Sequence, residues 1–302
     1  MFTSVMVRSA CSLVTLMLLG LPAAALLPIN SITSPRIYQS SLKMAIGDET
    51  MITDAEYVSA ANDAGANEAK AAVLKSKIFA ACATSDRGFA ASPSDRAAIE
   101  ALLADISPLS PTAVPSSGVA PEDEAYAPLR ACWRLVYTSA SDVSTLGANP
   151  LVAVGGIYQD ARDLPVIVNV IDVFPRALQN LPPGPFAASL ATSARLSVRT
   201  RARPRSATRV GLTFEAVEVE PLSILGNTPP SWLPSPPKLD FPTLGKDLQR
   251  QIFGVDADVD PRDAPENPGY FDVTYLDDDF LVIQQGAPGG MFAAVKVEEL
   301  AT

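Results

Sequence analysis

The chain has 302 residues and a formal net charge of −10, and 48% of its residues are hydrophobic. This is enough apolar material for the core of one large domain or two modest ones. It contains no histidine, which excludes Ser-His and Cys-His nucleophile pairs, His-ligated metals and the commonest general base near neutral pH. The acidic balance also argues against nucleic acid as a partner.

The first 47 residues contain no Asp or Glu, whereas the rest of the chain is rich in acids. Residues 1–25 have the anatomy of a secretory signal peptide, with a basic residue, an apolar run and small residues at a cleavage site. A membrane anchor is the rival interpretation. Pro22 and Pro28 interrupt the run before it reaches the roughly 20 residues that cross a bilayer, so the signal peptide is favoured.

Residues 26–47 are rich in Ser and carry Arg36 and Lys43 without any acid, a composition typical of transit peptides. A signal peptide followed by a transit peptide predicts a plastid protein that travels through the secretory route. Beyond these segments, 20 basic and 33 acidic residues remain, a net charge of −13. Cys82 and Cys132 also remain, and their spacing predicts neither a disulfide framework nor a zinc site.

Two amphipathic helices are expected in the segment 67–107. The first, over residues 67–84, has a stripe at helical spacing formed by Ala71, Leu74, Ile78 and Ala81 or Cys82. Ser92 is the expected N-cap of the second helix, which Pro108 ends. Residues 109–128 are rich in Pro, Ser and acids and are interpreted as a linker.

Alternation of apolar and polar residues predicts eight strands in the segment 130–300. Five are expected at residues 130–138, 155–159, 165–174, 194–202 and 210–220, and three more form a meander within 269–297. The acidic cluster at residues 277–279 supplies one turn of this meander. After Phe214 the apolar alternation changes phase, which predicts a β-bulge at Glu215 and Ala216.

Eight strands with mostly hairpin connections favour an antiparallel up-and-down barrel, which is either filled by side chains or holds one small ligand. A β-sandwich is the second choice. The proline-dense insertion at residues 221–268 is longer than an ordinary connection, which favours a lid or a binding loop. Trp232, Leu233 and Phe241 are the candidate lid residues, and packing on the outside of the barrel is an equal alternative.

Four motifs resemble those of the plastid lipid-associated proteins, also called fibrillins. They are TSDRG at residues 84–88, WRLVYTS at 133–139, GGIYQ at 155–159 and DVTYLDDD at 272–279. Their order, their spacing and the expected plastid address together carry the resemblance, which covers roughly residues 73–297. One departure concerns residues 280–286, where the family usually has arginines and this chain has none.

The resemblance implies a mainly β, lipocalin-like barrel that binds or stores isoprenoid or acyl lipids at plastoglobules or thylakoids. It implies a hydrophobic small molecule and a plastid membrane or plastoglobule surface as partners, and no cofactor. An alternative is a scaffold for an enzyme of prenylquinone or carotenoid metabolism, or such an enzyme itself. Asn169 and Asp172 are the best positions for catalysis, although exposure at a sheet edge explains Asp172 equally well. No catalytic residue is predicted.

Apolar residues on two expected strands are candidates for lining a ligand cavity. They are Trp133, Leu135 and Tyr137 on one strand and Phe271, Val273 and Tyr275 on another. Residues at such positions are more often ordinary core, so both interpretations stay open. The acids at 277–279 are predicted to form a turn and not a metal site, because they lack spaced ligands.

A cluster of arginines lies in a stretch of fifteen residues that contains no acid. It comprises Arg195, Arg199, Arg201, Arg203, Arg205 and Arg209. Its sign is opposite to that of the whole chain, which favours contact with anionic lipid head groups. The alternative is a solvated outer face around a hairpin turn.

Overall fold

The computed structural model describes residues 54–120, 126–140, 143, 147–232, 238–240, 269–286 and 289–300, with side chains from Gly65 onward. The expected signal and transit peptides lie outside these ranges. Two of the candidate lid residues, Leu233 and Phe241, also lie outside them.

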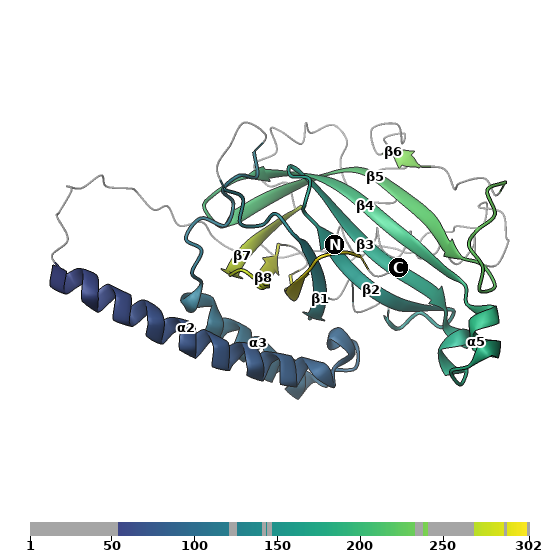
Figure 1. Ribbon diagram of the computed structural model, residues 1–302, viewed down its shortest axis with the longest axis horizontal. Coiled ribbons are helices and arrows are strands. Elements are labelled where there is room, and N and C mark those ends of the chain that lie inside the picture. Colours follow the sequence, from purple (N-terminus) through teal and green to yellow (C-terminus); the bar gives the residue numbers. More distant parts are fainter. Residues whose placement is uncertain are drawn as a thin grey trace, which may run out of the picture.

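Two helices precede the sheet and lie side by side along one side of it (Figure 1). Helix α2 (Asp54–Ala83) begins earlier than expected and buries the predicted stripe of Ala71, Leu74, Ile78 and Cys82. Helix α3 (Pro93–Ile106) begins with a capping box, in which Ser92 and Asp95 each accept a hydrogen bond from the backbone N–H of the other. Both helices and the predicted N-cap are therefore confirmed.

Within the described residues, nine strands form one antiparallel sheet. They are β1 (Cys132–Thr138), β2 (Val152–Asp160), β3 (Val166–Pro175), β4 (Ser193–Pro204), β5 (Arg209–Ser223), β6 (Leu239–Asp240), β7 (Tyr270–Leu276), β8 (Phe280–Gln285) and β9 (Met291–Val297). Their order is β4-β3-β2-β1-β9-β8-β7-β5-β6, and β4 also pairs with β5. Eight strands therefore close into a ring, and β6 is a two-residue addition beside β5. The predicted mainly β fold with eight antiparallel strands is confirmed.

Register shifts mark irregular places in the ring. Arg199 pairs with Ala216 and Thr200 pairs with Phe214, so Glu215 is the extra residue of the predicted bulge, which is confirmed. Similar shifts fall between Leu135 and Tyr137 in β1 and between Val273 and Tyr275 in β7. Each shift reverses the face to which the following side chains point.

The ring has apolar side chains on both faces where the helices cover it. One cluster inside includes Trp133, Phe271, Val273, Leu281 and Ile283. A second cluster outside joins the stripes of α2 and α3 to strands β1, β7, β8 and β9. Its largest members are Ile78, Ile99, Leu103, Tyr137, Tyr275 and Phe280. The helices are thus held by burial of apolar surface, which contributes on the order of 25 cal/mol per Å².

The segment 109–128, interpreted above as a linker, packs on the ring in the part that the structure describes. Thr112 Oγ1 donates to the carbonyl of Leu276 at 2.7 Å, and the backbone N–H of Ser116 donates to Ala207 O at 3.1 Å. Val119 is fully buried in the interior cluster. The segment therefore runs as a fixed strap over the ring. No helix of the described residues is both long and apolar enough to cross a membrane.

Candidate functional site

The inside of the ring contains a cavity of about 150 Å³. Its walls come from all eight strands of the ring and are mainly apolar, with Trp133, Ile171, Leu212, Phe271, Ile283 and Phe292 among them. Trp133 is 1% exposed, and its indole N–H donates to Leu129 O at 3.0 Å, which fixes the orientation of the indole. The cavity is thus a preformed apolar space beside a tryptophan of fixed orientation.

Three amides line this cavity, Gln285 of β8 and a neighbouring pair on β2 and β3 that gives it a polar side. Gln159 of β2 pairs in register with Asn169 of β3, and both side chains line the cavity. Gln159 Nε2 lies 3.5 Å from Asn169 Oδ1. Asp172 points to the opposite face, as predicted, and forms an ion pair with Arg195 there. The cavity can therefore hydrogen-bond a neutral polar group but contains no carboxylate from this strand.

Three of the six predicted lining residues, Trp133, Leu135 and Phe271, line the cavity. Val273 belongs to the adjoining interior cluster. Tyr137 and Tyr275 lie on the outer face and pack against the helices, so the expectation that they share the inner face is corrected. The cause is the pair of register shifts in β1 and β7, because an extra residue reverses the alternation on which that prediction rested.

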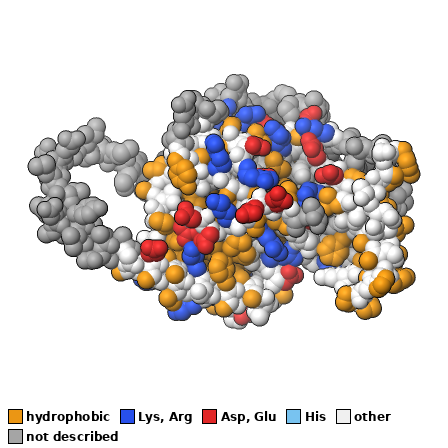
Figure 2. Space-filling model, viewed as in Figure 1, with side chains coloured by type: hydrophobic (Ala, Val, Ile, Leu, Met, Phe, Trp, Pro, Cys, Tyr) orange, Lys and Arg blue, Asp and Glu red, His pale blue; other side chains and the backbone are white. Residues whose placement is uncertain are grey.

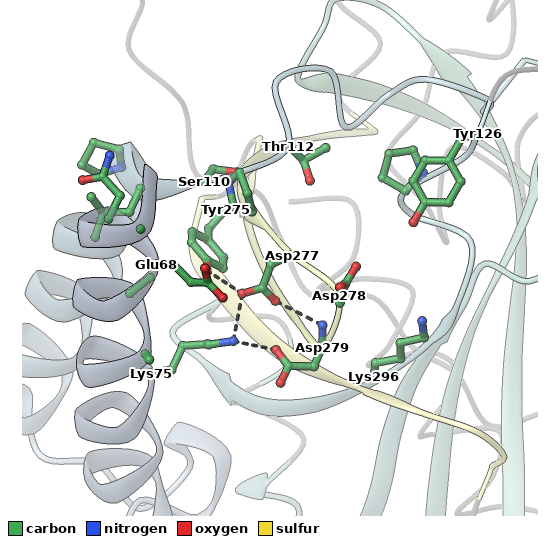
Figure 3. Close-up of a pocket in the computed structure, with 18 of the residues that line it drawn as sticks. Glu68, Lys75, Ser110, Thr112, Tyr126, Tyr275, Asp277, Asp278, Asp279 and Lys296 are labelled. Carbon is green, nitrogen blue, oxygen red and sulfur yellow. Dashed lines mark hydrogen bonds and ion pairs between the residues drawn. The ribbon is translucent and has the colours of Figure 1, made fainter. Parts of the chain in front are cut away.

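A partly buried ionic junction on the outer face joins α2 to the acidic turn between β7 and β8 (Figure 3). Lys75 of α2 points at this turn, and its Nζ lies 2.9 Å from Asp277 Oδ2 and 2.7 Å from Asp279 Oδ1. Tyr275 donates its hydroxyl to Asp277 at 2.5 Å, and the other Asp277 oxygen accepts the backbone N–H groups of residues 279 and 280. The sequence predicted the turn but gave no sign of its partner, Lys75.

These contacts shift the ionisation of the groups involved. Burial opposes the charged form of Asp277, but hydrogen bonds from Lys75, Tyr275 and residue 279 outweigh it and lower its pKa to about 2. Burial likewise opposes the charged form of Lys75, yet its bonds to Asp277 and Asp279 raise its pKa. Burial and the bond to Asp277 raise the pKa of Tyr275. The junction is therefore a structural ion pair at neutral pH.

A wide cleft of about 1530 Å³ adjoins the junction, between α2 and the strap. Figure 3 shows Glu68, Tyr126, Asp278 and Lys296 around it. Its lining mixes prolines, hydroxyls and charges of both signs, unlike the apolar walls that lipid ligands require. No group of three or more potential metal ligands exists among the residues that the structure covers. Burial raises the pKa of Cys82 to about 11 and raises that of Cys132, so neither is a thiolate at neutral pH.

Three carboxylates from neighbouring strands pair with four of the six arginines in the cluster. Arg195 pairs with Asp172, Arg199 and Arg201 with Glu215, and Arg209 with Asp272. Figure 2 shows basic and acidic side chains interspersed on this face. Strand pairing therefore brings acids that are distant in sequence next to these arginines. Arg203 and Arg205 are exposed and form no ion pair within the described ranges.

The TSDRG motif forms a tight turn, η1 (Asp86–Gly88), between the helices. The guanidinium of Arg87 donates to the carbonyls of Val154 and Gly155 in β2 and lies over the ring of Phe89, 4.9 Å from its centroid. Gly88 has φ +94° and lies so close to Thr138 O that a side chain there would collide with it. The motif therefore fixes the helices to β1 and β2. Trp232, the one described lid candidate, is 79% exposed and does not line the cavity.

The PAP_fibrillin family model matches residues 72–294, from within α2 to within β9. The chain belongs to the PAP/fibrillin family. Neither the curated proteins nor the solved structures contain a significant match. In this PAP/fibrillin protein all four motifs have structural roles, and Trp133 and Tyr137 of WRLVYTS pack inside and outside the ring. TSDRG and GGIYQ meet through Arg87, and DVTYLDDD binds Lys75.

Proposed function

We propose that this PAP/fibrillin protein binds isoprenoid or acyl lipids at plastoglobules or thylakoids, with the cavity of the ring as its lipid site. The observation that carries the proposal is the enclosed, mainly apolar cavity with two amides on one side. An apolar chain would contact the aromatic and aliphatic walls, and a carbonyl or hydroxyl could bond Gln159 or Asn169. Family membership supports lipid association in the plastid.

The size of the cavity limits what it accepts. A volume of about 150 Å³ is below the roughly 300–1,000 Å³ of typical ligand sites. The cavity therefore takes one end of a lipid, and the rest of the molecule extends outside it. Trp133, Leu135 and Phe271 are the proposed contacts, while Tyr137 and Tyr275 act through the packing of the helices.

A binding role is favoured over catalysis. The cavity is lined mainly by amides and apolar groups. The partly buried charges of Lys75 and Asp277, and of Arg195 and Asp172, are held in ion pairs that stabilise the fold. The alternative is a scaffold for an enzyme of prenyl-lipid metabolism, for which the wide cleft beside α2 is the available surface. We further propose that Arg203 and Arg205 contact anionic head groups. We also propose that the segment 221–268 acts as a lid over the lipid site.

The test is lipid binding by the chain from Asp48 onward. Lipids extracted from the purified protein are identified by mass spectrometry. Quenching is then measured for a plastid quinone in a Trp232→Phe background, where Trp133 is the remaining tryptophan. We expect a bound quinone ring or chain within a few ångströms of Trp133 to quench its emission strongly.

A cavity-filling variant supplies the control. Ala294 lines the cavity and is 8% exposed, so Ala294→Phe should fill the space and abolish quenching. Thr213 lies between the cavity-lining Leu212 and Phe214 in β5 and pairs with Arg201 on the outer face. Thr213→Phe adds a ring of the same size outside the cavity and should leave quenching intact. Equal quenching in the two folded variants would contradict binding in the cavity.

A further inference from the structure

The wall of the ring is incomplete between β1 and β2. Their ladder has three residue pairs and ends at Arg134 and Tyr158. However, β1 continues to Thr138 and β2 begins at Val152, and their other neighbours, β9 and β3, remain paired over these stretches. The register shift at Gly155 and Gly156 bends β2 at this place. The two strands therefore separate and leave a seam in the wall.

An outer groove of about 560 Å³ follows this seam. Its floor is apolar, formed by Leu135, Val136, Ile157 and Val295 with the two glycines of β2, and Phe79 and Ala83 of α2 form one wall. Leu135 and Ile157 line both the groove and the interior cavity. These two side chains thus lie between the groove and the cavity, and their movement would join the two spaces.

Two arginines, Arg87 and Arg134, and one acid, Asp86, line the groove, so its net charge is positive. Arg87 forms an ion pair with Asp86, so these two charges compensate each other, and Arg87 also donates hydrogen bonds to carbonyls of β2. Arg134 lines the groove, is exposed, and has no ion pair among the residues the structure describes. An exposed guanidinium beside an apolar floor fits an acidic head group that is followed by an apolar chain.

We propose that an amphiphilic lipid with a carboxylate head group lies across this seam. The end of its chain occupies the interior cavity, and its head group lies in the outer groove at Arg134. This inference rests on the proposed function and deepens it. It explains how a cavity of about 150 Å³ serves a longer molecule, because the groove of about 560 Å³ holds the rest. The lipid enters from the side and not through an end of the ring.

The test uses a fluorescent C18 polyene fatty acid and the alcohol with the same chain as probes. The protein is the chain from Asp48 onward with Trp232→Phe, so that energy transfer to the polyene reports proximity to Trp133. We expect the acid to bind about tenfold more tightly than the alcohol, as one charge-assisted hydrogen bond provides. Arg134→Gln should remove this preference and leave the alcohol unaffected.

A second variant narrows the groove without touching the cavity. Ala83 is exposed and lines the groove but not the cavity. Ala83→Trp should therefore weaken the binding of both probes by about tenfold or more. The matched controls are Lys70→Gln, an exposed basic residue of α2 that lines neither space and has no ion pair in the described structure, and Ala104→Trp, an exposed alanine of α3. Both controls should bind like the parent.

The outcomes separate this inference from the proposed function. In one outcome the parent shows energy transfer and Ala294→Phe abolishes it, but Arg134→Gln or Ala83→Trp binds the probes with unchanged affinity. This result overturns binding across the seam and leaves binding in the cavity intact. Absence of energy transfer in the parent overturns cavity binding itself. Loss of the acid preference in Arg134→Gln together with weaker binding in Ala83→Trp supports a lipid lying across the seam.

Discussion

Lys75 shows how one side chain can determine the position of a long helix. Its side chain is 19% exposed and its ammonium bonds two carboxylates of one turn, while the Asp277 side chain is 16% exposed. Truncating one partner of such a pair leaves the other charge partly buried without compensation, which costs more than an exposed pair contributes. The ion pair therefore sets the register of α2 on the ring, whereas apolar burial holds it there.

Replacing Lys75 by Met should lower the free energy of unfolding by about 2 kcal/mol, because hydrogen bonds to charged groups contribute roughly 1.5–3 kcal/mol. The measurement is urea unfolding. Lys77, on the same helix, is exposed and forms no ion pair among the described residues, so Lys77→Met is the control and should change stability by less than about 0.5 kcal/mol. Equal effects in the two variants would contradict the role of the junction.

Asp277 predicts how stability depends on pH. Its pKa is lowered from 3.8 to about 2 in the folded chain, so its contribution is present above pH 4 and is lost as the pH falls toward 2. The shift corresponds to about 2 kcal/mol. Unfolding should be measured from pH 5 to pH 2 for the wild type and for Asp277→Asn. The variant should be less stable at pH 5 and should lose less stability over this range; parallel curves would refute the assignment.

At the scale of elements, the turn between the helices depends on Gly88. Its positive φ and its contact with Thr138 O exclude a side chain, so Gly88→Ala should destabilise the protein by about 2 kcal/mol or more. Gly65 is in helix α2 with open space around it, so Gly65→Ala should stabilise by about 0.5–1 kcal/mol. Thermal unfolding of both variants checks the opposite signs, and a neutral Gly88→Ala would show that the turn can move.

Strand β4 offers a test of the remaining basic charge. Because Arg199 and Arg201 share Glu215, we expect membrane attraction to depend on Arg203 and Arg205, each contributing on the order of 1 kcal/mol near an anionic surface. Flotation with anionic vesicles at low salt should fall in the variant with both replaced by Glu. The control replaces Arg199 and Arg201 by Gln and should float like the wild type. Equal flotation of all three proteins would assign the arginines to a solvated face.

The elements were predictable to the extent that local pattern determines them. Alternation predicted all eight strands of the ring, and the phase change after Phe214 predicted its bulge. The bulges in β1 and β7 left no such sign, because Val136 and Thr274 fit either phase, and Tyr137 and Tyr275 were therefore assigned to the wrong face. The ion pairs of the arginines and of Lys75 join residues that are far apart in sequence, which no local pattern reveals.

At the scale of the whole molecule, the ring depends on closure between β5 and β7. These strands are adjacent in the ring although the insertion at residues 221–268 separates them in sequence, and three residue pairs join them. Where β5 and β7 pair, neither strand presents an open edge to another copy of the chain. The family match spans this closure, which is consistent with one folding unit built around the cavity.

The predicted plastid location of the protein is tested separately from its fold. A fluorescent protein fused to residues 1–47 should enter the plastid, because an apolar signal precedes an acid-free segment rich in Ser. Removing residues 1–25 from the fusion should abolish entry into the secretory route. Microscopy of both fusions in a cell with complex plastids is the measurement. Accumulation of the full fusion at the cell surface would refute the transit segment.

Strand β5 extends well past its short pairing with β7, and this has a consequence for solubility. It has fifteen residues, of which Arg209, Val210 and Gly211 pair with β7. Farther along, β6 pairs with Ala216 and Val217, and Lys238 beside it forms ion pairs with Glu218 and Asp240. This short strand shields backbone groups that another chain could otherwise bind. Cleavage that released β6 would leave β5 as a template for intermolecular strand addition, so the same chain could then aggregate with its ring still folded.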